Sequence, residues 1–227
     1  MPPKTADAAK LTIYKAIRAD IISGLKKPGE RLSIDRLKEK FGTSVTPVRD
    51  ALQMLSQEEL VTIKPRSGYY VTLVTLKELN DMMDLRGILE LAVVERAVRK
   101  ITDEQIRILE AIPHGYTDDR TESFVRYTEE NRKFHVMLAE FSGNHELALQ
   151  VGHLHDRLAR FMVMSNPGTE MIDTHARVLD RLKARDAGGA VRAVQKELAE
   201  GKALIMERIM EEEASFWHLG TAVPGKN

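Results

Sequence analysis

The 227-residue chain contains no cysteine, and only 5% of its residues are aromatic. Without cysteine it can have no disulfide framework, no thiolate nucleophile, no iron–sulfur cluster and no cysteine-ligated zinc site. Hydrophobic residues still make up 43% of the chain, an ordinary share for a globular protein, so we expect a sizeable buried core. This length fits one large domain or two small ones.

Long apolar runs are also missing. No stretch approaches the roughly 20 consecutive apolar residues that a membrane-spanning helix needs. Residues 1–10 lack the apolar centre of a secretory signal. We therefore expect a cytoplasmic protein that does not associate with membranes.

The formal net charge is zero, but the two signs are spread unevenly along the chain. Residues 1–74 carry 13 Lys and Arg against 8 Asp and Glu, a net charge of +5. Residues 75–227 carry 21 against 26, a net charge of −5. A basic segment joined to an acidic one favours nucleic-acid binding by the basic part, although an imbalance of this size also arises by chance.

The N-terminal part begins with three predicted helices. Apolar residues recur at helical spacing from Leu11 to Ile22, and a turn follows. Ser33 is a good N-cap for a short second helix, and Ser44 is a good N-cap for a third. Short turns between the helices fit a helix-turn-helix unit.

After the third helix the hydrophobic period changes to the alternation of β-strands. Residues 61–63 and 69–74 alternate between apolar and polar side chains, and the turn-forming residues 64–68 separate them. This pattern predicts a β-hairpin with a basic tip. Helices followed by such a hairpin predict a winged helix-turn-helix domain over residues 1–74.

The rest of the chain keeps a helical hydrophobic period. Short polar or Gly/Pro-containing breaks divide it into six segments. The predicted helices lie near residues 76–100, 103–112, 121–141, 145–164, 169–185 and 187–213. Short connections between six helices predict an antiparallel all-α bundle over residues 75–213, and we expect residues 214–227 to form a partly disordered tail.

The predicted third helix has the two faces that a DNA-recognition helix needs. Such a helix presents polar and basic side chains to the major groove and packs its other face on the preceding helices. Arg49 follows Thr46 by three residues, so both point the same way, and Arg suits bidentate contact with guanine. The candidate DNA contacts are Arg31, Thr43, Ser44, Val45, Thr46, Arg49, Lys64, Arg66 and Gly68. The alternative is that the unit is only a packing module, with Arg49 an ordinary surface residue.

Four polar side chains fall on the apolar faces of predicted bundle helices. Asn131 and His135 lie one turn apart, and His175 and Glu197 occupy the apolar stripes of later helices. Because unpaired polar groups are costly in a core, a divalent Zn, Ni or Mn ion is a candidate partner. The alternative is a set of core polar residues satisfied by hydrogen bonds. We expect surface or capping positions for the remaining histidines, His114, His145, His153, His155 and His218.

Two stretches of the chain resemble a known family. The run from Thr46 to Leu52, Thr-Pro-Val-Arg-Asp-Ala-Leu, resembles the GntR family of bacterial transcription regulators, and the likeness covers about residues 10–74. Residues 76–213 resemble more loosely the FCD domain of its FadR-like subclass. The residues that carry this second likeness are Leu85-Arg86 with Glu90, Asn131-x-x-Phe134-His135, Ser142-Gly143-Asn144, His175 and Arg185-Asp186-Ala187. The resemblance implies a homodimer that binds a pseudo-palindromic DNA operator and senses a small metabolite, usually as a repressor.

The resemblance also implies a metal site, in a modified form. Many FCD domains bind a metal through one Asp and three His, and here His135 and His175 stand at two of the His positions. Asn131 stands where Asp is usual, and Glu197 where the last His is usual. The DNA-reading part departs as well, because Val45 replaces the usual Arg and can meet a thymine methyl but cannot donate to guanine.

Effectors of this family are often carboxylates held against the metal, so nearby cationic side chains are candidates for binding them. Arg86 matches a family Arg and could clamp a carboxylate bidentately. Arg157 and Arg160 are further candidates. Each of these Arg side chains could instead pair with an acidic neighbour, such as Glu90 beside Arg86.

The leading interpretation is a metabolite-responsive transcription repressor that acts as a homodimer and is not an enzyme. A rival interpretation is a metalloenzyme in which Asn131, His135, His175 and Glu197 hold a catalytic metal with an open position. A third interpretation keeps the DNA-binding function but makes the sensor metal-free.

Overall fold

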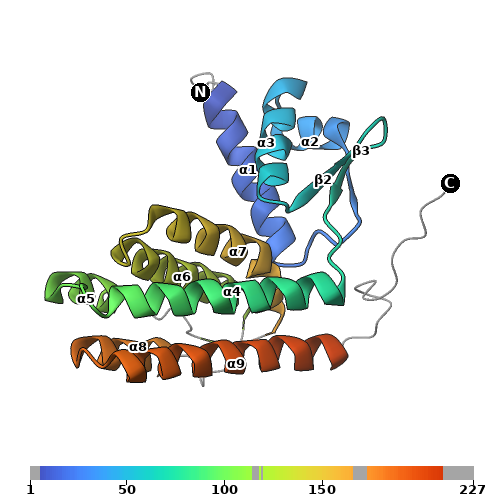
Figure 1. Ribbon diagram of the computed structural model, residues 1–227. Helices are drawn as coiled ribbons and strands as arrows, with labels where there is room; N and C mark the ends of the chain where they lie inside the picture. The colour runs from blue at the N-terminus through green and yellow to red at the C-terminus, as the bar shows by residue number, and fades with distance from the viewer. Residues whose placement is uncertain (1–5, 114–117, 119, 166–172, 212–227) are drawn as a thin grey trace.

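The structure, a computed structural model, describes residues 6–113, 118, 120–165 and 173–211. It has two parts, which we call the winged head, residues 6–74, and the helical domain, residues 75–211. The head stands on one side of the layered helices of the domain (Figure 1). No helix among the described residues is long and apolar enough to cross a membrane.

The winged head combines three helices with a small antiparallel sheet. Its elements in chain order are α1 (Ala6–Ile22), β1 (Arg31–Leu32), α2 (Ile34–Phe41), α3 (Val45–Gln57), β2 (Val61–Lys64) and β3 (Gly68–Val71). β3 lies in the middle of the sheet, between β1 and β2. Thr62 pairs with Tyr70 across the predicted hairpin, and Tyr70 pairs with Arg31 on its other side. The winged helix-turn-helix prediction is confirmed, with β1 as an additional strand.

Local sequence signals set both ends of α2 and the start of α3. The Ser33 hydroxyl accepts a hydrogen bond from the Arg36 amide, which caps α2. Gly42 ends that helix with a φ of 58°, a left-handed conformation that favours glycine. Pro47 lies in the first turn of α3, where its missing N–H leaves no helical hydrogen bond unmade.

One continuous core holds the head together. Ile13, Ile17 and Ile21 of α1 are each 1% exposed, and they pack with the fully buried Leu52 and Leu55 of α3. Leu11, which the sequence pattern placed on the same stripe, is exposed instead, because the buried stripe of α1 runs through Ile13, Ile17 and Ile21. The face of α3 opposite the core is therefore the one left for contacts outside the head.

The helical domain contains six helices. They are α4 (Leu76–Ala97), α5 (Asp103–Glu110), α6 (Thr121–Phe141), α7 (His145–Met164), α8 (Asp173–Lys183) and α9 (Ala187–Glu211). Capping boxes begin α4, between Thr75 and Glu78, and α5, between Thr102 and Gln105. α4 packs along α9, and α6 packs along α7, with a shared hydrophobic core between them (Figure 1).

The predicted helices of the bundle are all present, with shorter ends. α4 stops at Ala97 and α5 at Glu110, where the sequence pattern had extended them by three and two residues. α9 is described as far as Glu211, and the last two residues predicted for it lie outside the described residues. The first residues of the helix predicted over 169–185 lie outside the described residues, as does the whole of the predicted tail 214–227.

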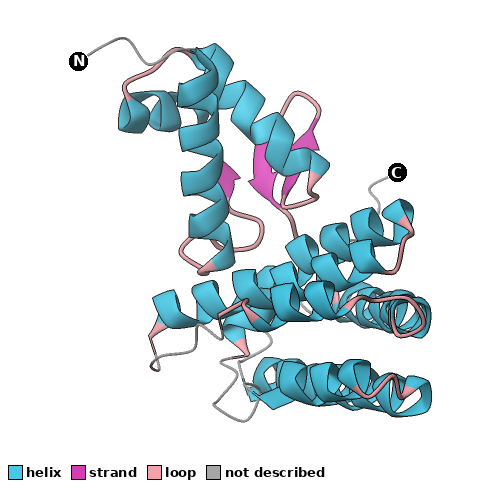
Figure 2. Cartoon of the chain, turned by 90° about the vertical axis from the view of Figure 1, so that its left-hand side faces the viewer, coloured by secondary structure: helices cyan, strands magenta, loops and turns pink. Residues whose placement is uncertain are grey.

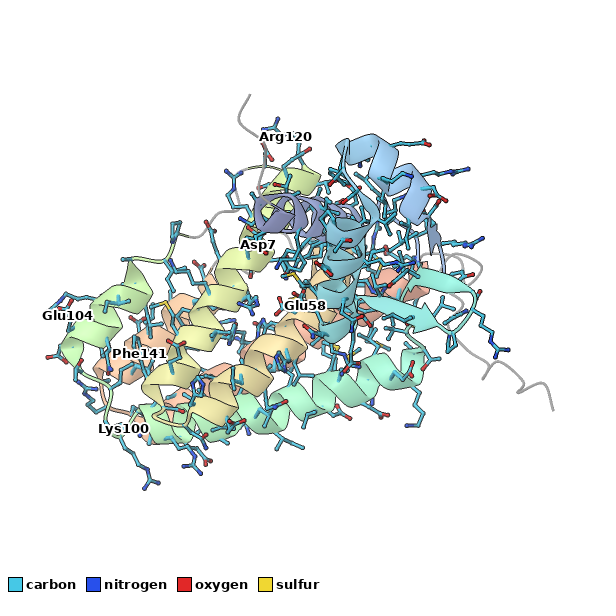
Figure 3. All side chains as sticks on the ribbon, turned by 90° about the horizontal axis from the view of Figure 1, so that it is seen from above. Asp7, Glu58, Lys100, Glu104, Arg120 and Phe141 are labelled. Carbon is cyan, nitrogen blue, oxygen red and sulfur yellow. The ribbon has the colours of Figure 1, made fainter. Side chains whose placement is uncertain are left out.

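The head and the helical domain meet where α1 packs against α7. Figure 2 shows α1 standing almost upright on the helical layers. Seen from above, Glu58 lies over the middle of the molecule, whereas Lys100 and Glu104 lie at the far end of the helical domain (Figure 3). The junction therefore covers only part of the upper face of the helical domain.

Candidate functional site

The outer face of α3 carries the side chains that the sequence assigned to base reading. Thr46 and Arg49 are exposed, while Val48 on the opposite side is fully buried. Ser44 has the extended backbone of an N-cap, but its hydroxyl makes no capping hydrogen bond and stays available. Thr43 and Val45 beside it are half-buried. The N-terminal end of α3 thus presents three hydroxyls, a small apolar side chain and a guanidinium.

The wing holds further basic side chains beside this helix. Lys64 and Arg66 are exposed at the tip of the β2–β3 hairpin, and the Lys64 Nζ lies 4.6 Å from the centre of the Tyr70 ring. Arg66 and Gly68 have positive φ values of 60° and 116°, which turn the hairpin tip. The Arg31 side chain runs along the wing, because a Cβ atom at Gly68 would lie 3.8 Å from the Arg31 Nε.

Among the described residues, Arg31, Arg49, Lys64 and Arg66 have no carboxylate within salt-bridge distance. Exposed cations without protein partners are available to phosphate oxygens and base edges. Their assignment to individual DNA contacts stays a prediction.

The four polar residues predicted to face the bundle core do converge. Asn131 and His135 come from α6, His175 from α8 and Glu197 from α9, and each is at most 7% exposed. The Glu197 Oε1 lies 3.0 Å from the His135 Nε2 and 3.3 Å from the His175 Nε2. The His175 Nε2 also lies 3.0 Å from the Asn131 Oδ1. Because all four are buried, they form a single polar site inside the helical domain.

A second group, which the sequence did not predict as part of the site, extends it towards α4 and α7. Glu90 of α4 accepts a hydrogen bond from the Arg86 Nε at 2.6 Å, and its Oε2 lies 2.7 Å from the His135 Nδ1. His155 of α7 places its Nε2 3.0 Å from the Glu90 Oε1. The expectation of a surface or capping role for His155 is therefore wrong, since this residue is only 1% exposed.

A periodicity signal for His155 and Glu90 exists in the sequence. His155 follows Val151 by four residues and precedes Leu158 by three, so it lies on the buried stripe of α7. His153, two residues earlier, faces solvent, so the His-x-His spacing alone does not indicate that His155 is buried. Arg86 and Glu90 lie on the buried stripe of α4 in the same way.

The charges of this site act strongly on its histidines. Burial works to lower the pKa of His135, but the carboxylates of Glu90 and Glu197 outweigh it and raise the pKa to about 9. Burial, reinforced by the Arg86 charge, lowers the pKa of His155 to about 3. Burial works to raise the pKa of Glu197, but His135 and His175 outweigh it and lower the pKa. At neutral pH two ionised carboxylates thus face a protonated His135 and a neutral His155.

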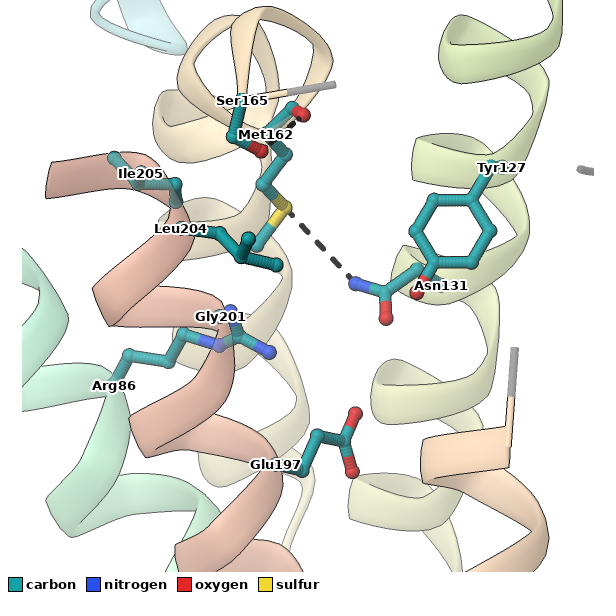
Figure 4. A pocket seen from close by; sticks show the side chains of 9 residues that line it. All are labelled: Arg86, Tyr127, Asn131, Met162, Ser165, Glu197, Gly201, Leu204 and Ile205. Atoms are coloured by element: carbon teal, nitrogen blue, oxygen red, sulfur yellow. Dashed lines mark hydrogen bonds between the residues drawn. The ribbon is translucent and has the colours of Figure 1, made fainter. Parts of the chain in front are cut away.

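A small cavity of about 40 Å³ opens beside the polar site. Arg86, Asn131 and Glu197 provide its polar wall, and Tyr127, Met162 and Leu204 lie among its other lining residues (Figure 4). A water molecule needs on the order of 10–15 Å³ by this measure, so the cavity has room for about three. A cleft or cavity with a few convergent polar groups is the usual form of a small-molecule site.

Comparison with known proteins decides the family of the chain. The family model for bacterial regulatory proteins of the gntR family matches residues 9–71, and the model for the FCD domain matches residues 81–200. The chain belongs to the GntR family. Its helical domain is an FCD domain, the ligand-binding effector part of these transcription regulators.

Relatives of known sequence agree with this assignment. The chain is 29% identical over 192 residues to the uncharacterized HTH-type transcriptional regulator YdhC of Bacillus subtilis (strain 168), covering 79% of this chain and 83% of the relative. It is 27% identical over 217 residues to the HTH-type transcriptional repressor RspR of Escherichia coli (strain K12), covering 90% and 91%. This GntR-family protein is a DNA-binding transcription regulator, and nothing in these matches supports the metalloenzyme alternative.

Solved structures share the fold. The structure of E. coli McbR/YncC has a TM-score of 0.68 and 23% sequence identity, covering 88% of this chain and 98% of that one. A GntR regulator from Rhodococcus sp. RHA1, described as a putative transcriptional regulator, has a TM-score of 0.65 and 20% identity, covering 87% and 97%. At these identities the likeness establishes the fold alone.

The donor set of this FCD domain fits a divalent transition metal. Ligand atoms that each lie about 2.0–2.2 Å from a shared ion are themselves about 3 Å apart, and three pairs of donor atoms in this site are 3.0–3.3 Å apart. Glu90 also suits the site, because a carboxylate on the far nitrogen of a metal-bound His fixes the orientation of its ring.

Glu90, His135 and His155 form a second cluster with ligand-like spacing. The Arg86 guanidinium donates directly to the Glu90 carboxylate, so a cation bound in this second cluster would lie next to a positive charge. The first cluster, Asn131, His135, His175 and Glu197, is therefore the better candidate for a metal.

The three Arg residues predicted to bind the effector lie in two different places, one at the cavity and two at the junction with the head. Arg86 lines the cavity and also pairs with Glu90. Arg157 pairs with Glu59 of the head at 3.0 Å, and the Arg160 Nη1 donates to the Thr72 carbonyl oxygen at 2.8 Å. Neither of the latter lines the cavity, because both face the junction between the head and the FCD domain.

A further ion-pair network ties the FCD domain to the head. Asp156 of α7 accepts from the Arg18 Nη2 of α1 at 2.5 Å. The same carboxylate accepts from the Arg132 Nε at 2.9 Å and the Arg132 Nη2 at 2.8 Å. Arg132 directly follows Asn131 of the polar site, and Asp156 directly follows His155. The junction and the polar site are thus built from neighbouring residues of α6 and α7.

Proposed function

We propose that the protein is a cytoplasmic repressor that binds operator DNA as a homodimer and releases it when a small carboxylate metabolite enters the cavity beside Arg86. The observation that carries the DNA part is the set of exposed, unpaired cations on α3 and the wing of a GntR-family head. In the docking that this fold uses, α3 enters the major groove and the wing follows the backbone.

In this reading Arg49 contacts a base, and the wing cations contact phosphates. Thr46 and Arg49 share the exposed face of α3, so both can reach base edges in one groove. Val45 adds apolar contact at a position where family members usually have Arg, which favours a thymine methyl over guanine. We expect the operator half-site to differ accordingly from those of relatives with Arg.

The homodimer is proposed from an exposed apolar face of α4. Leu85 and Ile88 are 46% and 67% exposed and lie three residues apart, on the side of α4 away from the core. A shallow groove lined by Leu91 of α4 and Leu198 of α9 runs alongside. Pairing of two such faces buries the apolar surface and places two heads on one duplex. Sedimentation equilibrium of the protein and of Ile88→Glu measures this directly.

For the effector, we propose that Arg86 binds a carboxylate through its terminal N–H groups. Its Nε is occupied by Glu90, and no other hydrogen bond to it occurs among the described residues. A divalent Zn, Ni or Mn ion held by Asn131, His135, His175 and Glu197 would add positive charge for the same anion. The chain's own residues orient the ligand in either case, with Tyr127 and Met162 lining the cavity beside it.

For the response, we propose that α7 transmits the signal. His155 of this helix lies in the polar site. On the same helix, Asp156 accepts a hydrogen bond from Arg18 of the head, and Arg160 donates one to the Thr72 carbonyl oxygen. A ligand that shifts α7 relative to α6 changes the seating of α1, and hence the spacing of the two recognition helices in the dimer.

The experiment that tests the function is a fluorescence-anisotropy titration with an operator selected from random duplex DNA. The selected duplex should bind at least 1,000-fold more tightly than scrambled DNA at physiological salt. Equal affinity for both duplexes would contradict the proposal.

A further inference from the structure

The cavity of the FCD domain presents an acceptor without a partner. The Glu197 Oε1 contacts both His135 and His175, but the Oε2 is buried and has no hydrogen-bond partner among the described residues. Leaving an ionised oxygen unsatisfied in a protein interior is costly. Because Glu197 lines the cavity, a molecule in that cavity is placed to satisfy this oxygen (Figure 4).

The same cavity also presents a donor without a partner. Arg86 reaches it from α4, and within the described part of the chain only its Nε makes a hydrogen bond, to Glu90. Its two terminal nitrogens are left for a ligand, in the geometry that matches a carboxylate. Figure 4 shows the guanidinium and the Glu197 carboxylate reaching towards the same space from α4 and α9.

The charges of the cavity wall do not favour a ligand that is only an anion. The Arg86 guanidinium pairs with the Glu90 carboxylate at 2.6 Å, and the protonated His135 meets Glu197 through its Oε1, so the Glu197 Oε2 keeps no donor among the described residues. A simple carboxylate on Arg86 would bring a further negative charge close to Glu197. A ligand that also carries a positive donor group would satisfy both ends of the cavity.

We propose that the effector is a small zwitterion of the α-amino-acid class, with its carboxylate on the Arg86 guanidinium and its ammonium on the Glu197 Oε2. This inference rests on the proposed function and narrows the ligand of the same cavity. Because His135 and His175 both contact the Glu197 Oε1, the Oε2 is the oxygen left for the ammonium. Met162, Leu204 and Ile205 offer an apolar wall for a short side chain.

The test compares pairs of ligands that differ only at the α-substituent. Isothermal titration calorimetry of the full-length protein is run with glycine, alanine, serine and valine, each beside the α-hydroxy acid of the same carbon skeleton. The best amino acid should bind about 10- to 100-fold more tightly than its hydroxy acid, the worth of one charge-assisted hydrogen bond. Equal or tighter binding of the hydroxy acids, or no binding of any amino acid, overturns the inference.

A matched pair of variants assigns the preference to one carboxylate. Glu197→Gln removes the charge but keeps the shape, so the amino acid should lose its advantage over the hydroxy acid. Glu200→Gln makes the same change one turn along α9, where the carboxylate pairs with Arg177 near the surface, and should keep the full preference. An unchanged preference in Glu197→Gln contradicts the assignment.

Operator binding separates this inference from the proposed function. If a hydroxy acid rather than an amino acid releases the selected operator, the regulator function stands and the zwitterion assignment is wrong. If the protein does not distinguish operator from scrambled DNA, the proposed function fails whatever the calorimetry gives. The ligand comparison in the parent protein needs no variant, so it remains decisive if Glu197→Gln does not fold.

Discussion

Asp156→Asn is the most informative perturbation of the junction between the FCD domain and the head. The Asp156 side chain is 10% exposed and accepts three hydrogen bonds, one from Arg18 and two from Arg132. Asparagine keeps the size of the side chain but loses its charge and one acceptor oxygen. Two guanidinium groups are then left close together without their shared counter-ion.

The expected loss follows from the exposure of the three partners. Removing one member of a buried charged network costs about 3–5 kcal/mol. Arg132 is 37% exposed and Arg18 17% exposed, so solvent screens part of this interaction. We therefore expect the free energy of unfolding to fall by about 2–3 kcal/mol. Asp81→Asn is the matched control, because Asp81 pairs with Lys77 on the exposed face of α4, where solvent screens the pair, and this change should leave the free energy of unfolding nearly unaltered.

The assay combines urea unfolding with operator titrations with and without ligand. If α7 carries the signal, the ligand should change operator affinity by about 5- to 150-fold in the parent protein and by much less in Asp156→Asn. Loss of stability with an undiminished response to ligand would refute the role of this network in coupling. An unchanged free energy of unfolding would refute the energetic reasoning itself.

Four other predictions follow from the same structure. Arg49→Ala should cost about 1–3 kcal/mol on the selected operator and much less on scrambled DNA; equal losses in the two titrations would make Arg49 a phosphate contact. Elemental analysis of protein purified without chelator should find about one transition metal per chain, with lower occupancy in His135→Ala; metal-free protein whose stability ignores chelator would end the metal proposal. Arg86→Ala should abolish ligand binding in calorimetry; unaltered binding would remove Arg86 from the site. In chelator, the free energy of unfolding should be greatest near pH 6.5. The raised pKa of His135 gives stability that is complete below the unfolded pKa of about 6.5. That stability, up to about 3 kcal/mol, is lost as the pH rises through the folded pKa of about 9. The lowered pKa of His155 gives stability that is present above about 6.5 and is lost as pH falls, so urea midpoints that rise steadily from pH 5 to 9 would contradict this assignment.

The predictable part of the polar site is the part set by helix periodicity. Asn131 and His135 are four residues apart on a stripe that also carries Phe134 and Leu138, so their inward direction follows from the sequence. The same reasoning applies to His175 and Glu197 within their own helices. The family resemblance then supplies the reason why three different helices should bring these side chains together.

Helix periodicity does not predict the contacts between the head and the FCD domain. The pairing of Asp156 with Arg18 joins residues 138 positions apart, and it depends on how the head sits on α7. Arg157 and Arg160 were assigned to the effector because a helical pattern says which side of α7 a residue occupies, not which neighbour covers that side. β1 escaped prediction for a similar reason, since two residues show no alternation and gain their strand geometry only by pairing with β3.

The salt dependence of operator binding tests the central claim most directly. Arg31, Lys64 and Arg66 give three candidate phosphate contacts per head, hence six in a dimer. At about 0.9 counterions released per contact, log Kobs should fall linearly with log salt with a slope of about −5. The charge-removing triple variant of these three side chains should flatten that slope towards zero. A selected operator bound with a salt-independent affinity, or a slope unchanged in the triple variant, would contradict the account of this head as a DNA-reading surface.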